Sequence, residues 1–173
     1  MRTNKQTNKQ TNQDTVSQDA ASIRPAPITI ESLCYSDTAI ARGIDNSPPS
    51  SLLPNLRRLA SGLDSIQIAL GSAIDISSGY RCPELNRIVG GTPGSQHQLG
   101  QAADFVCTAF GEPIQVATAI VNSRIDYDQI ILEFGRWVHV SFSASPRRRA
   151  LTIYASADGY LDGIVTSEGH RLA

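Results

Sequence analysis

The chain has 173 residues, of which 40% are hydrophobic, and it carries a formal net charge of -1 with a pI near 6.3. This length and composition suit a single globular domain with a hydrophobic core. A charge so close to zero gives no general attraction to nucleic acid or to an anionic membrane, and we expect neither as a partner. The run Arg147–Arg149 is a local basic spot, which we interpret as solvated surface.

The sequence shows neither a recognisable targeting segment nor a cysteine motif. No apolar stretch reaches the roughly 18 residues that a membrane-spanning helix needs, and the N-terminus lacks the apolar core of a secretory signal. The three cysteines, Cys34, Cys82 and Cys107, are odd in number and form no CxxC pair. They therefore indicate neither a disulfide framework nor a thiolate zinc cluster, and they fit synthesis in a reducing compartment.

The N-terminal region differs in composition from the rest of the chain. Residues 1–26 are mostly polar, and a Thr-Asn-Lys-Gln repeat runs through their first half. Because such a segment has little to bury, we predict a disordered tail at 1–26 and a single ordered domain at 27–173. Within that domain a helix is expected to begin at Ser36 or Asp37, and residues 45–50 form a turn-rich loop.

The spacing of apolar residues predicts one long helix. Large apolar side chains recur alternately four and three residues apart, which places them in one stripe along a helix. These positions are Leu52, Leu56, Leu59, Leu63, Ile66 and Leu70. Gly71 is expected to end the helix, and Pro54 lies in its first turn, where a missing amide hydrogen does little harm.

The remaining segments mix strand and helix patterns. Two apolar runs, 129–134 and 137–142, are split by a Gly-Arg pair, which indicates a hairpin. The other expected elements are a strand at 73–77, a helix at 84–89, a strand at 102–107, a helix at 112–122 and a strand at 151–155. Since the hairpin makes part of the sheet antiparallel, we predict an α+β fold rather than a doubly wound sheet.

His97, Asp104 and His139 form a candidate metal site. Two imidazole nitrogens and one carboxylate oxygen suit Zn²⁺, and three protein ligands leave a fourth position for water, as in catalytic zinc sites. Gly100 lies between the first two residues and can take the tight turn that folds one ligand back over the other.

Each member of this set also has a plainer interpretation. Asp104 could cap a turn, His97 could be an exposed loop residue, and His139 could be a hydrogen-bonded core histidine. The metal interpretation gains support from the alternation of Trp137, His139 and Ser141, because their side chains share one face of a strand.

Hydrolysis at such a site needs a base near the attacking water, and Glu133 is the candidate. A two-residue hairpin loop would turn Glu133 away from the metal ligands. A three-residue loop at 134–136 pairs it with Trp137 instead and brings it to the metal side, so the chemistry requires the longer loop. If Glu133 is a solvent-facing edge residue, Asp128 or Asp126 is the substitute base.

Substrate contacts are assigned to four residues near these groups. Arg81 follows a predicted strand, and its guanidinium can hold a substrate carboxylate or carbonyl through two parallel hydrogen bonds. Its plainer interpretation is a surface ion pair with Glu84. Ser95 and Gln96 can bind substrate backbone, although loop-capping roles fit them equally well. Trp137 completes the set.

Five motifs occur in order along the chain. They are Ser77-Ser-Gly-Tyr-Arg-Cys-Pro-Glu-Leu-Asn86, Val89-Gly-Gly91, Ser95-x-His-x-x-Gly-x-Ala-x-Asp104, Tyr127-Asp-Gln-Ile-Ile-x-Glu133 and Trp137-Val-His-Val-Ser141. Together they resemble the zinc D-Ala-D-Ala carboxypeptidase family of murein peptidases, in particular its branch from bacteria and their phages. The likeness runs from about Ile30 to Phe142.

The resemblance implies a hedgehog/DD-peptidase fold, which is a small, mainly antiparallel sheet flanked by helices. It also implies that Arg81 orients the substrate and that zinc is bound by His97, Asp104 and His139.

One position departs from the family pattern. Several members carry the catalytic acid three residues before the last histidine, where this chain has Arg136. Hedgehog signalling domains, which share the fold and the zinc site, place an acid six residues before that histidine. Glu133 has this second spacing.

We therefore expect a monomeric zinc metallopeptidase that hydrolyses a peptide bond in the peptidoglycan stem, as a D-Ala-D-Ala carboxypeptidase or an endopeptidase. Without a signal peptide, it would be made in the cytoplasm and reach the cell wall after release, as a phage endolysin does, or as part of a phage. One alternative is a non-catalytic, zinc-containing module for cell-wall binding or assembly. Another is a cytoplasmic D-Ala-D-Ala dipeptidase.

Overall fold

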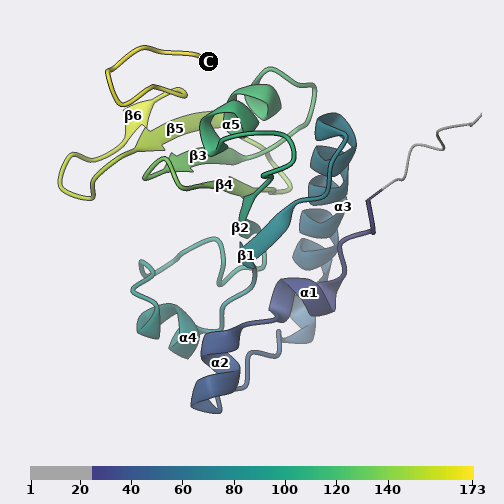
Figure 1. Ribbon diagram of the computed structural model, residues 1–173. Coiled ribbons are helices and arrows are strands. Elements are labelled where there is room, and N and C mark those ends of the chain that lie inside the picture. The colour runs from purple at the N-terminus through teal and green to yellow at the C-terminus, as the bar shows by residue number, and fades with distance from the viewer. Residues whose placement is uncertain (1–24) are drawn as a thin grey trace, which may run out of the picture.

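A six-stranded, mostly antiparallel sheet forms the centre of the fold (Figure 1). The computed structural model describes residues 25–173, so the tail predicted at 1–26 lies almost wholly outside the described residues. The predicted α+β class is confirmed. The elements are α1 (Ile30–Cys34), α2 (Asp37–Arg42), a 3-10 turn (Ser50–Leu52), α3 (Leu53–Leu70), β1 (Asp75–Ser78), α4 (Pro83–Ile88), β2 (Ala102–Val106), α5 (Pro113–Val121), β3 (Gln129–Glu133), β4 (Trp137–Ser141), β5 (Arg149–Ile153) and β6 (Leu161–Asp162).

The strands lie in the order β1-β2-β4-β3-β5-β6. Neighbours are antiparallel except β3 and β5, which run parallel, and β3 with β4 forms the predicted hairpin. The predicted last strand corresponds to β5, although it begins at Arg149 rather than Leu151. The sequence does not predict β6, because two exposed residues are too few to show an alternating pattern.

The long helix predicted from the leucine spacing is α3. Gly71 ends it, as expected: its φ is +63°, in the left-handed region that glycine enters without strain, and its N–H bonds back to the last helical turn. The stripe of apolar side chains is buried in the main core, with no exposed surface at Leu56, Leu59, Leu63 and Ile66.

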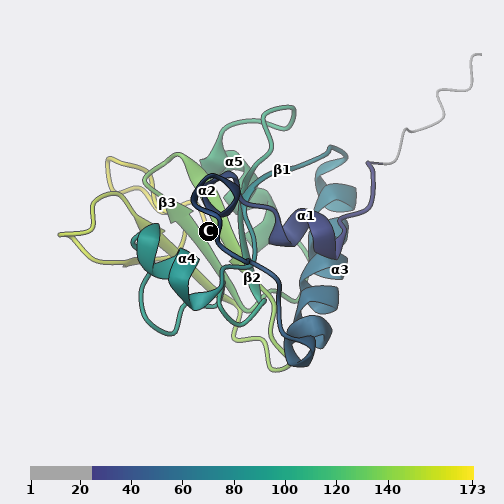
Figure 2. The same ribbon diagram turned by 90° about the horizontal axis from the view of Figure 1, so that it is seen from below.

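Short helices from the first half of the chain lie beside the sheet. α2 begins at Asp37 with Ser36 as its N-cap, as predicted. The sequence does not predict α1, because five residues do not display a helical period, but a capping box between Thr29 and Ser32 explains its start. In the view from below, α4 and α3 lie on opposite sides of β2 (Figure 2). The three cysteines are free.

The two faces of the sheet differ because side chains alternate along each strand. One face joins α3 and α5 in the hydrophobic core through Ala103, Phe105, Ile130, Leu132, Val138 and Val140. Asp104 on β2 and His139 on β4 lie between these apolar residues, so they point to the other face. The burial of the apolar face therefore fixes which way the two candidate ligands point.

Gly62 marks the closest approach between α3 and the sheet. A Cβ atom at this position would lie well inside van der Waals contact of the buried Phe142 ring. Glycine to alanine in a helix normally stabilises by about 1 kcal/mol, but overpacking a core costs roughly 1–3 kcal/mol. We expect Gly62→Ala to lower the free energy of unfolding in denaturant titrations. Ser61→Ala, an exposed neighbour on the same helix, should not lower it, and a stabilised Gly62→Ala would contradict this packing.

Candidate metal centre

The strand register brings Asp104 and His139 together. They are direct partners in the antiparallel pair β2–β4, and the side chains of such partners lie on the same face about 5 Å apart at Cβ. The remaining neighbour of Asp104 is Ser78 on β1, and that of His139 is Ile131 on β3. Two candidate ligands thus come from adjacent central strands, where backbone hydrogen bonds on both sides hold them.

His97 reaches the same place from the loop before β2. Gly100 takes a φ of +62° in this loop, as the tight turn between His97 and Asp104 requires. The His97 ring is 3% exposed, and its Nδ1 lies 2.7 Å from the carbonyl oxygen of Gly79. A carbonyl only accepts hydrogen bonds, so Nδ1 must carry the proton. Nε2 is then left with its lone pair directed toward Asp104 and His139.

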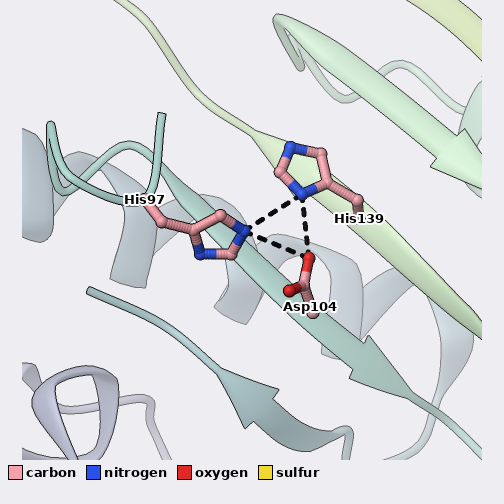
Figure 3. A group of neighbouring side chains, drawn as sticks. All are labelled: His97, Asp104 and His139. Atoms are coloured by element: carbon pink, nitrogen blue, oxygen red, sulfur yellow. Dashed lines mark hydrogen bonds and ion pairs between the residues drawn. The ribbon is translucent and has the colours of Figure 1, made fainter. Parts of the chain in front are cut away.

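Three atoms converge at the centre of this site (Figure 3). Asp104 Oδ1 lies 2.8 Å from His139 Nδ1 and 3.2 Å from His97 Nε2, and the two nitrogens are 3.2 Å apart. Ligands about 2.0–2.1 Å from a tetrahedral ion are about 3.3 Å from each other. The triangle therefore has nearly the size that a shared metal ion requires, and these residues can hold one.

The electrostatics of the centre point the same way. Burial lowers the pKa of His97, and this effect exceeds the opposing attraction of Asp104. Burial alone would raise the pKa of Asp104, but its hydrogen bond with His139 is the main interaction that holds it well below its usual value. A carboxylate oxygen and an unprotonated nitrogen at 3.2 Å repel each other unless a cation lies between them. The cluster is therefore suited to a bound cation.

Arg81 contacts the second oxygen of Asp104. Its Nη2 donates to Asp104 Oδ2 at 2.7 Å, and its Nε donates to Ser78 Oγ at 2.8 Å. Within residues 25–173 this ion pair takes the place of the surface pair with Glu84 considered from the sequence. Arg81 therefore fixes the orientation of a candidate ligand, and it also lines the cleft beside it.

Glu133 lies on the metal side of the hairpin. The loop has three residues, 134–136, and Glu133 pairs with Trp137, as the chemistry requires. Phe134 and Gly135 both adopt positive φ in this turn. Glu133 lines the same cleft as the three candidate ligands. Burial raises the pKa of its carboxyl, the charge of Asp104 adds to this effect, and His139 opposes it.

An open cleft of about 810 Å³ contains all of these groups. Its walls include Arg81, the loop around Ser95 and Gln96, and Trp137, which packs against Phe134 with ring centroids 5.3 Å apart. Such a cleft admits an extended ligand from solvent, with the three candidate ligands and Glu133 exposed to the same space.

Comparison with known proteins matches residues 26–141 to the family described as peptidase M15. The match covers well over half of the chain. The chain belongs to this family, that of the zinc D-Ala-D-Ala carboxypeptidases. No curated protein matches the chain.

Membership of the M15 family implies a peptidase with a peptide substrate. All three candidate ligands, Arg81 and Glu133 lie within the matched residues. In the part of the chain that the structure describes, no helix has the length and apolar character needed to span a bilayer.

In this M15 peptidase, Asp128 has a structural role that the sequence does not predict. Its carboxylate is 1% exposed and accepts hydrogen bonds from Gln96 Nε2, from Ser141 Oγ, and from the backbone N–H and guanidinium of Arg147. A carboxylate with so many donors has no lone pair directed into the cleft, so it does not fit the substitute base considered above. Asp126 is also unsuited, because it is exposed beside Arg148.

The three arginines of the basic run are exposed, as predicted, but each also lies within reach of a carboxylate. Arg147 pairs with buried Asp128, and Arg149 lies 3.5 Å from Asp162. Long-range pairing of this kind leaves no local pattern, so sequence reasoning missed it. The cleft also includes Tyr160, from a segment to which no function was assigned.

Ser95 and Gln96 make different hydrogen bonds. The Ser95 hydroxyl accepts the backbone N–H of His97, and the Gln96 amide donates to Asp128. The Ser95 bond corresponds to the loop-capping alternative, whereas Gln96 bonds to a residue far outside the loop, and both residues also line the cleft. The indole N–H of Trp137 is buried and has no hydrogen-bond partner among residues 25–173.

Replacing Asp128 should lower the free energy of unfolding by an amount that depends on pH. The hydrogen bonds from Arg147, opposed by burial, hold the pKa of Asp128 below its usual 3.8. The ionised carboxylate therefore stabilises the fold above about pH 4, and this contribution is lost as pH falls through the lowered folded pKa. We expect Asp128→Asn to reduce the free energy of unfolding by about 1–3 kcal/mol at pH 7, and by less near pH 3.

Urea titrations at several pH values measure this difference. Asp126→Asn is the matched control, because Asp126 is 82% exposed and should contribute little at any pH. A stable Asp128→Asn variant that lost only catalysis would instead support the role of a base.

Proposed function

We propose that this M15 peptidase is a zinc-dependent hydrolase that cleaves a peptide bond in the stem peptide of peptidoglycan. The observation that carries the proposal is the triangle of His97 Nε2, Asp104 Oδ1 and His139 Nδ1, with sides of 2.8–3.2 Å, beside Glu133 in an open cleft. Family membership supports the same chemistry.

Zinc fits the donor set better than the harder divalent cations. Calcium and magnesium favour all-oxygen ligands, whereas two imidazoles with one carboxylate are typical of Zn²⁺ sites with an open coordination position. When bound, zinc acts as a Lewis acid that polarises a substrate carbonyl and makes a water molecule more acidic. The Gly79 carbonyl, which fixes the tautomer of His97, and Arg81, which holds Asp104, keep the ligands in place for it.

Glu133 is assigned as the general base. Its partly buried carboxyl lines the cleft with the ligands, and its raised pKa brings it closer to that of a group able to exchange protons at neutral pH. It removes a proton from the attacking water and then donates it to the nitrogen of the leaving amine. The three-residue loop that places Glu133 opposite Trp137 is the local feature on which this role depends.

Arg81 is assigned to substrate orientation. Two of its N–H groups are engaged with Ser78 and Asp104, and the residue lines the cleft. Its other N–H groups can donate to a substrate carbonyl or carboxylate while the guanidinium itself is held still. Arg81 therefore serves two functions, one toward a metal ligand and one toward the peptide.

The stem peptide is proposed as the substrate on the basis of the family and its five sequence motifs. The reaction is either removal of a terminal D-Ala or an internal cut. The rival, a non-catalytic zinc module for wall binding or assembly, does not require an acid in the cleft, and Glu133 with its raised pKa is the feature that favours catalysis.

Metal binding can be tested without any substrate. We expect one Zn²⁺ per chain in elemental analysis and a rise in melting temperature when zinc is added to chelator-treated protein, because binding only the folded state stabilises it. His139→Ala should lose both signals. His170→Ala is the control, since this exposed histidine lies outside the cluster, and it should retain them. Equal zinc binding by both variants would exclude the proposed ligand set.

Activity is tested by digesting murein and identifying the released muropeptides by mass spectrometry. Zinc-loaded protein should shorten or open stem peptides, and excess chelator should abolish this. We expect Glu133→Gln to bind zinc normally but to reduce kcat roughly 10²–10⁴-fold, because base and proton donor are lost together. Glu84→Gln, an exposed acid on α4, should retain full activity.

The products distinguish the alternatives. Binding to sacculi without any new amino group would identify a non-catalytic module. Turnover of free D-Ala-D-Ala without any action on intact murein would identify a dipeptidase. Full activity in excess chelator would exclude zinc chemistry altogether.

A further inference from the structure

Arg147 is a cleft residue that lies outside the part of the chain shared with the family. The family match ends at residue 141, and Arg147 follows in the segment between β4 and β5. Its side chain lines the cleft together with His139 and Glu133. Neither of its arginine neighbours does so: Arg148 lies near Asp126 and Arg149 near Asp162.

The guanidinium of Arg147 is held in place on one edge. Its Nε and Nη2 donate to the two oxygens of Asp128, and its backbone N–H donates to Oδ1 as well. Asp128 is itself buried, so this anchor cannot swing away. The long side chain has thus already lost most of its freedom before a ligand arrives, which lowers the entropic cost of binding.

The other edge of the guanidinium is free to bind. Among residues 25–173, no hydrogen bond occupies Nη1, and the side chain is 53% exposed. Guanidinium N–H groups form a planar fork that matches a carboxylate. A fixed, half-exposed fork in the wall of a peptide cleft is suited to a carboxylate on the peptide.

The position of Arg147 relative to the metal centre can be followed through its anchor. Asp128 accepts hydrogen bonds from Gln96, which precedes His97, and from Ser141, which lies two residues after His139 on β4. Two residues along a strand span about 7 Å. An extended substrate rises by about 3.3–3.6 Å per residue, so we expect a substrate group that reaches Arg147 to lie roughly two or three residues from the centre.

We propose that Arg147 is a specificity residue that binds a substrate carboxylate two or three residues away from the scissile bond. The inference rests on the proposed function, since it assumes that the cleft takes a peptide. It assigns to the segment after the family match the task of selecting acidic peptides, while the matched residues carry the chemistry.

Paired peptides test this role directly. Each pair has one sequence, with either a carboxylate or a carboxamide at a single position two or three residues from the scissile bond. Binding is followed through the fluorescence of Trp137, the chain's one tryptophan, which lines the cleft, so no turnover is needed. We expect zinc-loaded and metal-free protein alike to bind one carboxylate peptide about fivefold to tenfold more tightly than its carboxamide partner.

Three variants test whether Arg147 causes the difference in affinity between the two peptides. Arg147→Gln should lose the discrimination, and Arg147→Lys should retain part of it, because the charge remains but the fork is lost. Arg149→Gln is the matched control, with 54% exposure against 53%, and should discriminate as the unchanged protein does. Melting curves confirm that each variant is folded.

Two results would overturn the inference while leaving the proposed function intact. One is murein cleavage by a protein that binds both peptides of every pair equally. The other is an Arg147→Gln variant that binds both peptides more weakly by the same factor, because this result indicates a structural role through Asp128. A protein that neither binds the peptides nor cleaves murein would refute the proposed function and the inference together.

Discussion

The Asp104 carboxylate is the group on which the rest of the site depends. Its Oδ1 faces both imidazoles, and its Oδ2 accepts a hydrogen bond from Arg81. A buried carboxylate is stable only when it is paired and hydrogen-bonded, and here His139 and Arg81 provide those partners. The backbone pairing of β2 with β4 sets this arrangement, because it puts Asp104 directly across from His139. The central strands of the sheet therefore determine the geometry of the site, and the loops add His97 and Arg81 around it.

Much of this could be predicted from the sequence because the relevant patterns are local. The four-and-three spacing of leucines predicts α3, and Gly71 marks its end. Alternation along 137–141 predicts that His139 shares a face with Trp137, and the requirement for a three-residue loop predicts the register of Glu133. These features depend on the spacing of apolar residues, with a period of 3.6 in helices or 2 in strands, and on turn length. All of these can be recognised in a single sequence.

The remaining features depend on contacts between distant segments. Asp128 accepts hydrogen bonds from Gln96 and Arg147, which lie on opposite sides of it in sequence. The residues next to Asp128 in the sequence do not predict these bonds. The Gly79 carbonyl that fixes the tautomer of His97 is a backbone group, so its role is invisible in a residue pattern. The arginine run is ambiguous for the same reason, because solvated and paired arginines look alike until the acids near them are known.

The parallel pairing of β5 with β3 has a consequence for the limits of the domain. The family match stops at residue 141, before β5 begins, yet β5 pairs with β3 along its whole length. A chain cut at that boundary would leave β3 as an edge strand, with Ile130, Ile131 and Leu132 beside a row of unpaired amides and carbonyls. Exposed apolar edges of this kind recruit strands from other molecules and promote aggregation. The segment beyond the family match thus protects the sheet against self-association, and any minimal soluble version of this peptidase has to include it.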